Sequence, residues 1–193
     1  MKLILASKSG VRKKILDDNS IECDVVHSNV DEDQAKESFI EMGADPLIIS
    51  KNLAELKSVK VSLKHPDRIV LGADSVISHN DKLINKPKSR EEALSILKRL
   101  NNSTHFLISS VCISKNGSMI WNYTDKAKLT MKNFTDDELK NYLSKISDET
   151  LYAYNVYQIE GEGRSLFAKI EGDEDTIMGL PVKQIKEYLK NFK

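Results

Sequence analysis

The stretch Lys2-Leu-Ile-Leu-Ala6, followed by Ser7-Lys-Ser-Gly10 and Val11-Arg-Lys-Lys14, decides how the chain begins to fold. The apolar run predicts a strand, and the small residues after it predict a turn onto a helix with Ser9 as N-cap. The N–H groups at a helix start lack intrahelical partners and carry the positive end of the dipole, so the turn favours an anion. Three cations in the first helical turns strengthen this interpretation, and phosphate is the obvious candidate. An ordinary strand–turn–helix with a solvated basic face explains the segment equally well.

A second informative run is Val70-Leu-Gly-Ala-Asp-Ser-Val-Ile77, in which one acid interrupts apolar residues. A fully buried, unpaired carboxylate is too costly, so Asp74 predicts the point where a buried strand reaches the mouth of a cleft. Shortly afterwards, Ile84-Asn-Lys-Pro87 places Lys86 beside a rigid proline turn. The sequence thus offers an acid and a fixed cation close together along the chain.

Helix and strand signals in the rest of the chain predict an α/β fold with a partly antiparallel sheet. Asp45-Pro46 is typical of an N-cap followed by proline and starts a helix that runs to about Val61. Two capping boxes open further helices, an Asn-Gly pair predicts a hairpin, and an amphipathic helix closes the chain. The segments are Ser89-Arg-Glu-Glu92 and Thr135-Asp-Asp-Glu138 for the boxes, 104–114 and 119–132 for strands joined across Asn116-Gly117, and 182–192 for the last helix.

The composition of the chain limits the classes of function that it can have. The 193 residues suit one domain, and a formal net charge of zero gives no overall field toward nucleic acid or an anionic membrane. Cys23 and Cys112 lie among apolar residues without metal-ligand spacing, so we expect core thiols. The four histidines also lack ligand spacing, and no serine stands in a G-x-S-x-G elbow. Since no signal peptide or membrane-spanning run is visible, we expect a cytoplasmic protein.

Eight short motifs then occur in the order found in the Maf (septum-formation-inhibitor-like) family of nucleoside triphosphate pyrophosphatases. The chain resembles this family over essentially its whole length, and the order is more specific than any one motif. The motifs are Leu5-Ala-Ser-Lys-Ser9, Val30-Asp-Glu32, Ala54-Glu-Leu-Lys57, Gly72-Ala-Asp-Ser75, Asn85-Lys-Pro87, Tyr157-Gln-Ile-Glu-Gly161, Ile170-Glu-Gly-Asp173 and Met178-Gly-Leu-Pro181.

The resemblance implies an α/β fold with a single domain over residues 1–193. Two lobes are expected around a cleft, with a central twisted mixed β-sheet flanked by helices, as in inosine triphosphate pyrophosphatases. The implied activity is metal-dependent hydrolysis of a nucleoside triphosphate to the monophosphate and pyrophosphate, with Mg²⁺ or Mn²⁺ as cofactor. The implied role includes clearing non-standard nucleotides. The expected partner is the substrate alone, without nucleic acid or membrane, and a homodimer is left open.

By the same resemblance, Asp74 corresponds to the catalytic proton acceptor and Glu32 to a second acid, so both are candidate catalytic residues and metal ligands. Read alone, Lys57 would be a helix-surface lysine and Glu32 part of a solvated acidic run. As residues lining the cleft, Lys57 and Lys86 are expected to leave the fold unaffected when replaced. The candidate substrate-binding residues are Ser7, Arg12, Lys57 and Lys86 at phosphate positions, together with Ser75 and Glu160.

Three departures from the family pattern bear on the substrate. Val11 stands where the first of two arginines is usual, Tyr152-Ala153 replaces an Asp-Lys pair, and Glu160 replaces a glutamine. Glutamine matches the uracil edge, whereas a carboxylate accepts from two adjacent donors, as on guanine. Glu160 therefore favours a guanine-type, 7-methyl-GTP-like substrate, although Ser75 after Asp74 is closer to the pyrimidine branch. The alternative interpretation of Glu160 is a structural carboxylate in a glycine-rich turn.

A second function class stays open at this point: a non-catalytic protein that senses or binds a nucleotide in cell-division control. The retained Asp74, Glu32, Lys57 and Lys86 favour the enzyme, because binding alone does not require an acid beside phosphate-binding cations. The missing arginine and Asp-Lys pair keep the binding protein in consideration.

Overall fold

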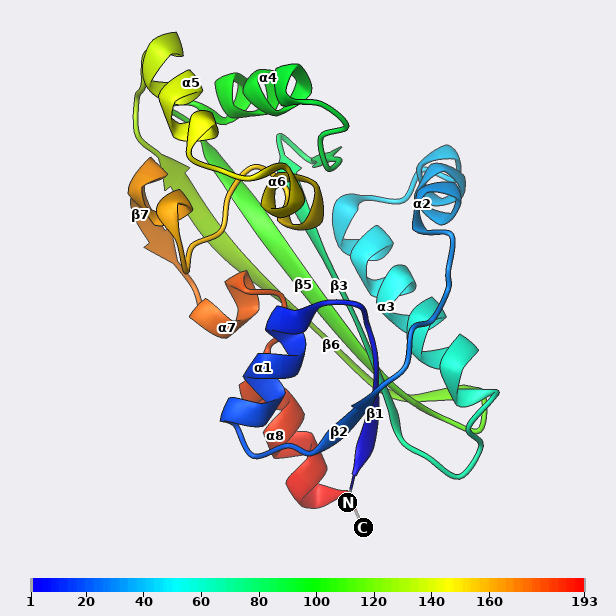
Figure 1. Ribbon diagram of the computed structural model, residues 1–193. Helices are drawn as coiled ribbons and strands as arrows, with labels where there is room; N and C mark the ends of the chain where they lie inside the picture. The colour runs from blue at the N-terminus through cyan, green and yellow to red at the C-terminus, as the bar shows by residue number, and fades with distance from the viewer. Residues whose placement is uncertain (1, 193) are drawn as a thin grey trace.

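A mixed β-sheet runs the length of the molecule, with helices packed along it and at both ends (Figure 1). The computed structural model describes residues 2–192. The strands are β1 (Leu3–Ala6), β2 (Cys23–Val25), β3 (Val70–His79), β4 (Lys82–Ile84), β5 (Thr104–Lys115), β6 (Ser118–Met131) and β7 (Phe167–Glu171). Their order is β2-β1-β3-β5-β6-β7, and β4 pairs with β3. Because β1 is parallel to β2 and β3 while the other pairs are antiparallel, the predicted mixed sheet is confirmed.

The helices are α1 (Gly10–Asp18), α2 (Glu32–Glu41), α3 (Pro46–Ser62), α4 (Arg90–Leu100), α5 (Asp136–Ser144), α6 (Asp148–Tyr154), α7 (Glu174–Ile177) and α8 (Val182–Asn191), with a 3₁₀ turn at Glu162–Leu166. Five of them, α1, α3, α4, α5 and α8, begin at the predicted signals, whereas α2, α6 and α7 were not predicted. Ser9 and Asp45 cap α1 and α3, and the capping box of Thr135 is complete. None of the helices in the described part of the chain is long and apolar enough to cross a membrane.

The capping box predicted at Ser89 forms only in part. Ser89 accepts from the backbone N–H of Glu92, as expected, but the Glu92 carboxylate accepts from the N–H of Lys88 at 2.8 Å instead of that of Ser89. Ser89 has a more extended φ of −150°, whereas Thr135 has −74° in the complete box. The extended backbone at Ser89 brings the N–H of Lys88, instead of that of Ser89, toward the Glu92 carboxylate.

The two larger of three apolar clusters in the described residues give the molecule two lobes, as predicted. One cluster joins α4, α5 and α6 to the sheet, and the other joins α1 and α8 to it (Figure 1). β3 and β5 run through both, since Ile77 and Leu107 belong to the first cluster while Leu71 and Val111 belong to the second. The sheet therefore connects the lobes into one unit.

The connection between β5 and β6 is the predicted Asn-Gly hairpin. Asn116 and Gly117 both have positive φ, at 52° and 74°, as the mirror-image turn of a tight hairpin requires. Cys23 and Cys112 are buried free thiols, which confirms their assignment to the core.

The helix α3 approaches the sheet most closely at Gly72 of β3. A Cβ atom on Gly72 would lie 2.2 Å from the carbonyl oxygen of Ala54 and 2.8 Å from the amide nitrogen of Ser58. Such a separation excludes any side chain, so glycine is required for the backbones to meet. The close approach brings Lys57, on the facing side of α3, to the strand residue Asp74.

Candidate active site

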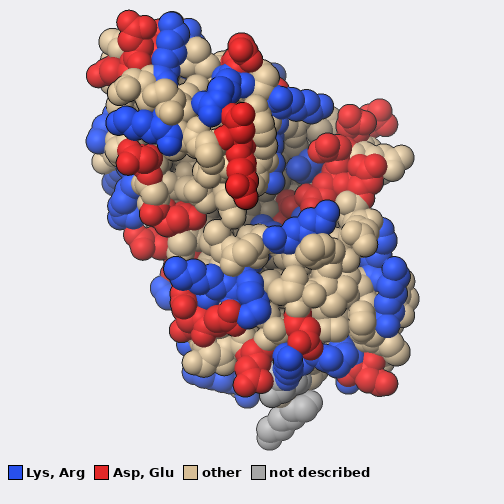
Figure 2. All heavy atoms as spheres, in the orientation of Figure 1, with Lys and Arg blue, Asp and Glu red and all other residues tan. Residues whose placement is uncertain are grey.

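A cavity of about 370 Å³ lies between the lobes. Its walls come from the β1–α1 loop, α2, α3, β3 and the segments that follow β4 and α6. Figure 2 shows charged side chains of both signs around the hollow between the lobes. All eight residues proposed as site residues line it: Ser7, Arg12, Glu32, Lys57, Asp74, Ser75, Lys86 and Glu160.

Two carboxylates and one ammonium group form the centre of the site. Lys57 Nζ lies 2.8 Å from Asp74 Oδ1 and 3.0 Å from Glu32 Oε1. Asp74 and Lys57 are only 4% and 5% exposed, whereas the Glu32 side chain keeps 44% of its surface accessible. The second oxygen of Asp74, Oδ2, is buried and has no hydrogen-bond partner among residues 2–192. A buried acceptor of this kind destabilises the fold unless a ligand or a water molecule supplies the missing partner.

The buried position of Lys57 corrects the expectation that its replacement leaves the fold unaffected. Lys57 does line the cleft, but its ammonium group neutralises a carboxylate that is itself buried. Removing either partner of such a pair leaves an uncompensated charge in a poorly solvated place. Lys57 therefore supports folding as well as the site.

Glu32 enters the cleft because α2 begins there. Asp31 caps the helix by accepting from the N–H of Gln34, which makes Glu32 the first helical residue. Partial burial raises the pKa of Glu32, but the attraction of Lys57, aided by two further lysines, outweighs it and brings the pKa below its ordinary value. Glu32 is thus held as a carboxylate at neutral pH.

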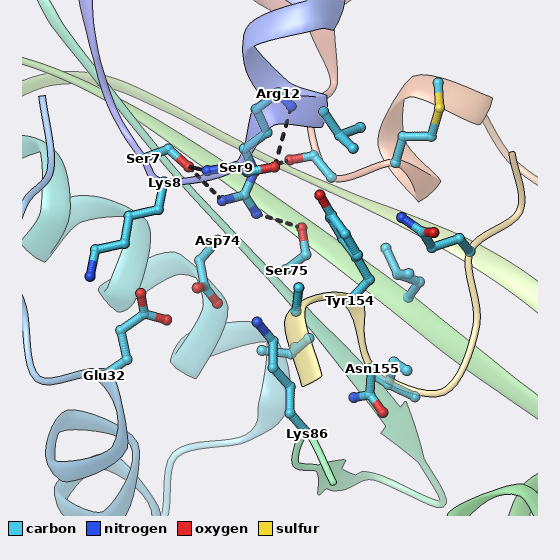
Figure 3. Close-up of a pocket in the computed structure, with 18 of the residues that line it drawn as sticks. Ser7, Lys8, Ser9, Arg12, Glu32, Asp74, Ser75, Lys86, Tyr154 and Asn155 are labelled. Atoms are coloured by element: carbon cyan, nitrogen blue, oxygen red, sulfur yellow. Dashed lines mark hydrogen bonds between the residues drawn. The ribbon is translucent and has the colours of Figure 1, made fainter. Parts of the chain in front are cut away.

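Arg12 lines the cleft but is largely engaged by the protein itself. Its Nε donates to the Gly179 carbonyl at 2.9 Å, and Nη1 donates to the Ala73 carbonyl at 3.0 Å. Nη1 and Nη2 also donate to the hydroxyls of Ser7 and Ser75, at 3.3 and 3.1 Å (Figure 3). Four of the five N–H groups of the guanidinium are therefore occupied, and burial lowers its pKa. Arg12 joins the first loop to both sides of Asp74.

The other two cations at the start of α1, Lys13 and Lys14, do not line the cavity, in keeping with the alternative of a solvated basic face for this segment. Lys13 pairs with Asp17 one turn along the helix, and Lys14 is exposed outside the cavity. The helix start still faces the cleft through Ser7 and Ser9, and Ser9 accepts from the Arg12 N–H.

Lys86 and Glu160 both line the cleft. Lys86 extends toward Asp74 (Figure 3), and surrounding protein lowers its pKa despite the attraction of Glu32. Glu160 is exposed at the rim, where the Gln158 amide donates to its Oε1 at 3.3 Å.

Sequence reasoning missed several residues that line the cavity: Lys8, Lys36, Tyr154, Asn155 and Gln158. Lys8 stands inside the quoted Ser7-Lys8-Ser9 turn, and Lys36 lies four residues after Glu32, on the same face of α2. The spacing between Glu32 and Lys36 therefore indicates from the sequence that Lys36 also faces the cleft. Asn155 has φ 72° and ψ −159°, a backbone conformation rarely adopted by residues other than glycine.

Two hydrogen-bonded aromatic side chains, His105 and Tyr157, form a buried layer under the cleft wall. His105 is completely buried, and its Nε2 lies 2.8 Å from the hydroxyl of Tyr157, which lines the cavity. The other ring nitrogen, Nδ1, is buried and finds no hydrogen-bond partner in the described part of the chain. Burial, with a smaller contribution from His79, lowers the pKa of His105 to about 4.

We expect this histidine to make the protein less stable in mild acid. The unfolded chain protonates it near pH 6.5 and the folded protein only near 4, so the unfolded state binds more protons between these values. The free energy of unfolding therefore decreases as pH falls from 6.5 to 4, by about 3 kcal/mol from this group. Urea titrations at stepped pH measure the effect.

The matched variants are His105→Gln, whose amide retains a partner for Tyr157, and the exposed His27→Gln. The acid-dependent loss should shrink in His105→Gln and persist in His27→Gln. An unchanged pH dependence in His105→Gln would assign the acid sensitivity to other groups.

The chain matches the family described as Maf-like protein over residues 2–192. It is 71% identical over 191 residues to the nucleoside triphosphate pyrophosphatase of Pelagibacter ubique, covering 99% of this chain and 98% of the relative. A 7-methyl-GTP pyrophosphatase of Brucella abortus is 34% identical over 193 residues, covering 100% and 97%. A solved structure of a HAM1 protein from Coxiella burnetii aligns with a TM-score of 0.52 at 11% identity, over 99% of both chains. This likeness supports the predicted fold class.

Proposed function

The chain belongs to the Maf-like protein family, and from that premise we propose that it hydrolyses a nucleoside triphosphate to the nucleoside monophosphate and pyrophosphate. Relatives named for this reaction support the proposal at the level of the whole chain. The arrangement of side chains around Asp74 supports it at the level of the site.

The observation that carries the proposal is the unpartnered Oδ2 of Asp74, in a cleft that also contains Lys57 and Glu32. A nucleotide-binding protein without catalysis has no need for a buried acid next to phosphate-binding cations, because the acid repels the phosphate. An enzyme needs a proton acceptor at that place. Lys57 reduces the cost of burying the Asp74 carboxylate by pairing with Oδ1, and this pairing leaves Oδ2 available.

In the proposed reaction, Asp74 Oδ2 accepts a proton from the water that attacks the α-phosphorus. The bond between the α-phosphorus and the bridging oxygen breaks, and pyrophosphate leaves. Lys57 holds Asp74 in orientation through Oδ1, at 2.8 Å. Arg12 fixes the strand on both sides of Asp74, since it bonds to the Ala73 carbonyl and the Ser75 hydroxyl.

The two acids also fit a divalent cation. Asp74 Oδ2 is a buried carboxylate oxygen that no other described residue bonds, and Glu32 lies on the other side of Lys57. The described residues contain no cluster of three or more His, Cys, Asp or Glu side chains suited to a metal. Mg²⁺ and Mn²⁺ suit such a sparse site, because they retain waters and use one or two carboxylates plus substrate phosphates. When bound, the cation polarises phosphoryl oxygens.

Pyrophosphate release from a panel of nucleoside triphosphates, with Mg²⁺ or Mn²⁺ and with a chelator, tests the proposal. We expect stoichiometric monophosphate and pyrophosphate, and loss of release with the chelator. Nucleotide binding without release from any member of the panel would instead identify a sensing or binding protein.

We further propose a guanine-type base for the substrate. Glu160 stands at the rim of the cleft as an acceptor, and a carboxylate pairs with two adjacent N–H donors of guanine. Against the uracil edge, its oxygens would face a carbonyl acceptor. The relative named 7-methyl-GTP pyrophosphatase supports the same choice.

Glu160→Gln is expected to shift the relative kcat/KM toward UTP or dTTP by at least about tenfold, because mismatched polar groups cost about 1–3 kcal/mol. Steady-state kinetics with GTP, 7-methyl-GTP, UTP and dTTP measure the ratio. Glu162→Gln is the matched control, since Glu162 is exposed nearby but does not line the cavity. A wild-type preference for UTP, unchanged in Glu160→Gln, would show that Glu160 does not contact the base.

A further inference from the structure

Two lysines of the cleft, Lys8 and Lys36, have no role in the reaction described above. Lys8 lies in the β1–α1 loop and is exposed, and Lys36 lies on α2 and is half-buried. Among the described residues, neither has a carboxylate oxygen within 4.0 Å of its ammonium group. Both therefore present an unneutralised charge to the cavity.

The remaining cations of the cleft are already engaged, with one exception. Lys57 is held between two carboxylates, and Arg12 uses four of its N–H groups on protein acceptors. Within residues 2–192, Lys86 joins Lys8 and Lys36 as a cleft lysine that forms no ion pair. The lysines also affect one another: after burial, the charge of Lys36 contributes to lowering the pKa of Lys86. An anion with several charges would relieve this repulsion.

The position of the lysines indicates which part of a nucleotide they meet. In Figure 3, Tyr154 and Asn155 lie on one side of Asp74, while Lys8 and Glu32 lie on the other. Glu160 lines the cavity together with the 153–159 segment, so the base belongs on the side of Tyr154. With the α-phosphate at Asp74, the rest of the phosphate chain extends toward the β1–α1 loop and α2.

We propose that Lys8 and Lys36 bind the β- and γ-phosphates, the part of the substrate that leaves as pyrophosphate. The proposal rests on the proposed function and deepens it. Two ammonium groups at this place offset the charge that develops on the leaving group when its bond to the α-phosphorus breaks. They also favour triphosphates over diphosphates, because a diphosphate lacks the γ-phosphate, and over monophosphates, which lack both.

Inorganic pyrophosphate and GMP, titrated separately into the full chain by calorimetry, test the assignment. Lys8→Ala and Lys36→Ala should each raise the Kd of pyrophosphate by about tenfold, and the double variant by more. The Kd of GMP should stay within about twofold. Lys14→Ala is the matched control, because Lys14 is exposed on α1 outside the cavity and removes the same charge. Lys36→Gln replaces Lys36→Ala if the alanine variant unfolds at a lower temperature.

The kinetic counterpart is the ratio of kcat/KM for GTP to that for GDP, which should fall by about tenfold in the double variant. An unchanged pyrophosphate Kd in the double variant would overturn the assignment. A loss equal to that of Lys14→Ala, or an equal loss for GMP, would overturn it too. Pyrophosphate binding does not require turnover, so these results remain decisive even if the wild-type protein hydrolyses no triphosphate and the proposed function fails.

Discussion

Asp74→Asn is expected to lower kcat by roughly a hundredfold to ten-thousandfold, while nucleotide Kd stays within about tenfold. The asparagine carbonyl oxygen would take the place of Oδ1 beside Lys57, which turns the NH₂ group toward the cleft. That group donates hydrogen bonds and cannot accept the proton of a water. Single-turnover pyrophosphate release measures the loss, and calorimetry measures the binding.

The exposed Asp67→Asn serves as the control for this variant. It removes one carboxylate from the same part of the chain without touching the cleft. Retention of more than about a tenth of the wild-type kcat in Asp74→Asn would exclude Asp74 as the proton acceptor.

Lys57→Met is expected to reduce both stability and activity. It keeps most of the side-chain volume but leaves the buried Asp74 carboxylate without its cation, which costs about 3–5 kcal/mol of unfolding free energy. kcat/KM should fall by about tenfold to a thousandfold, since Asp74 loses its orientation. Urea denaturation and steady-state kinetics measure the two losses, with the half-buried Lys51→Met of the same helix as control.

A second substitution separates the two effects of Lys57. In Lys57→Met combined with Asp74→Asn, the buried charge of Asp74 is removed with its partner and only the half-exposed Glu32 loses an ion pair, so most of the stability should return while activity stays low. If the double variant is as unstable as Lys57→Met, packing of the lysine stem, and not charge, accounts for the loss.

The sequence predicted those parts of the molecule that depend on local signals. The caps of Asp45 and Thr135, the Asn116-Gly117 turn and the strand around Asp74 each have a short-range physical cause, and all appear in the structure. Family resemblance added Glu32, which read alone belonged to a solvated acidic run.

Other parts of the site depend on tertiary contacts that leave little trace in the sequence. Two acceptors of Arg12 are backbone carbonyls, those of Ala73 and Gly179, which any residue could provide. The burial of Lys57 depends on how closely α3 approaches β3, and this distance is a property of the packed pair. Lys36 could be inferred only from its helical spacing to Glu32, which the family resemblance had placed at the cleft, because the position of α2 beside the cleft is not encoded in α2 alone.

The contact at Gly72 divides the cleft into a part that tolerates mutation and a part that does not. A single methyl group added at Gly72 would overlap the backbone of α3, the helix that holds Lys57 beside Asp74. Substitutions at this contact therefore destabilise the fold. Lys8 and Glu160 lie on exposed segments, where most substitutions change stability by no more than about 0.5 kcal/mol. Evolution can therefore vary the choice of nucleotide at the rim, while the chemistry is inherited together with the fold.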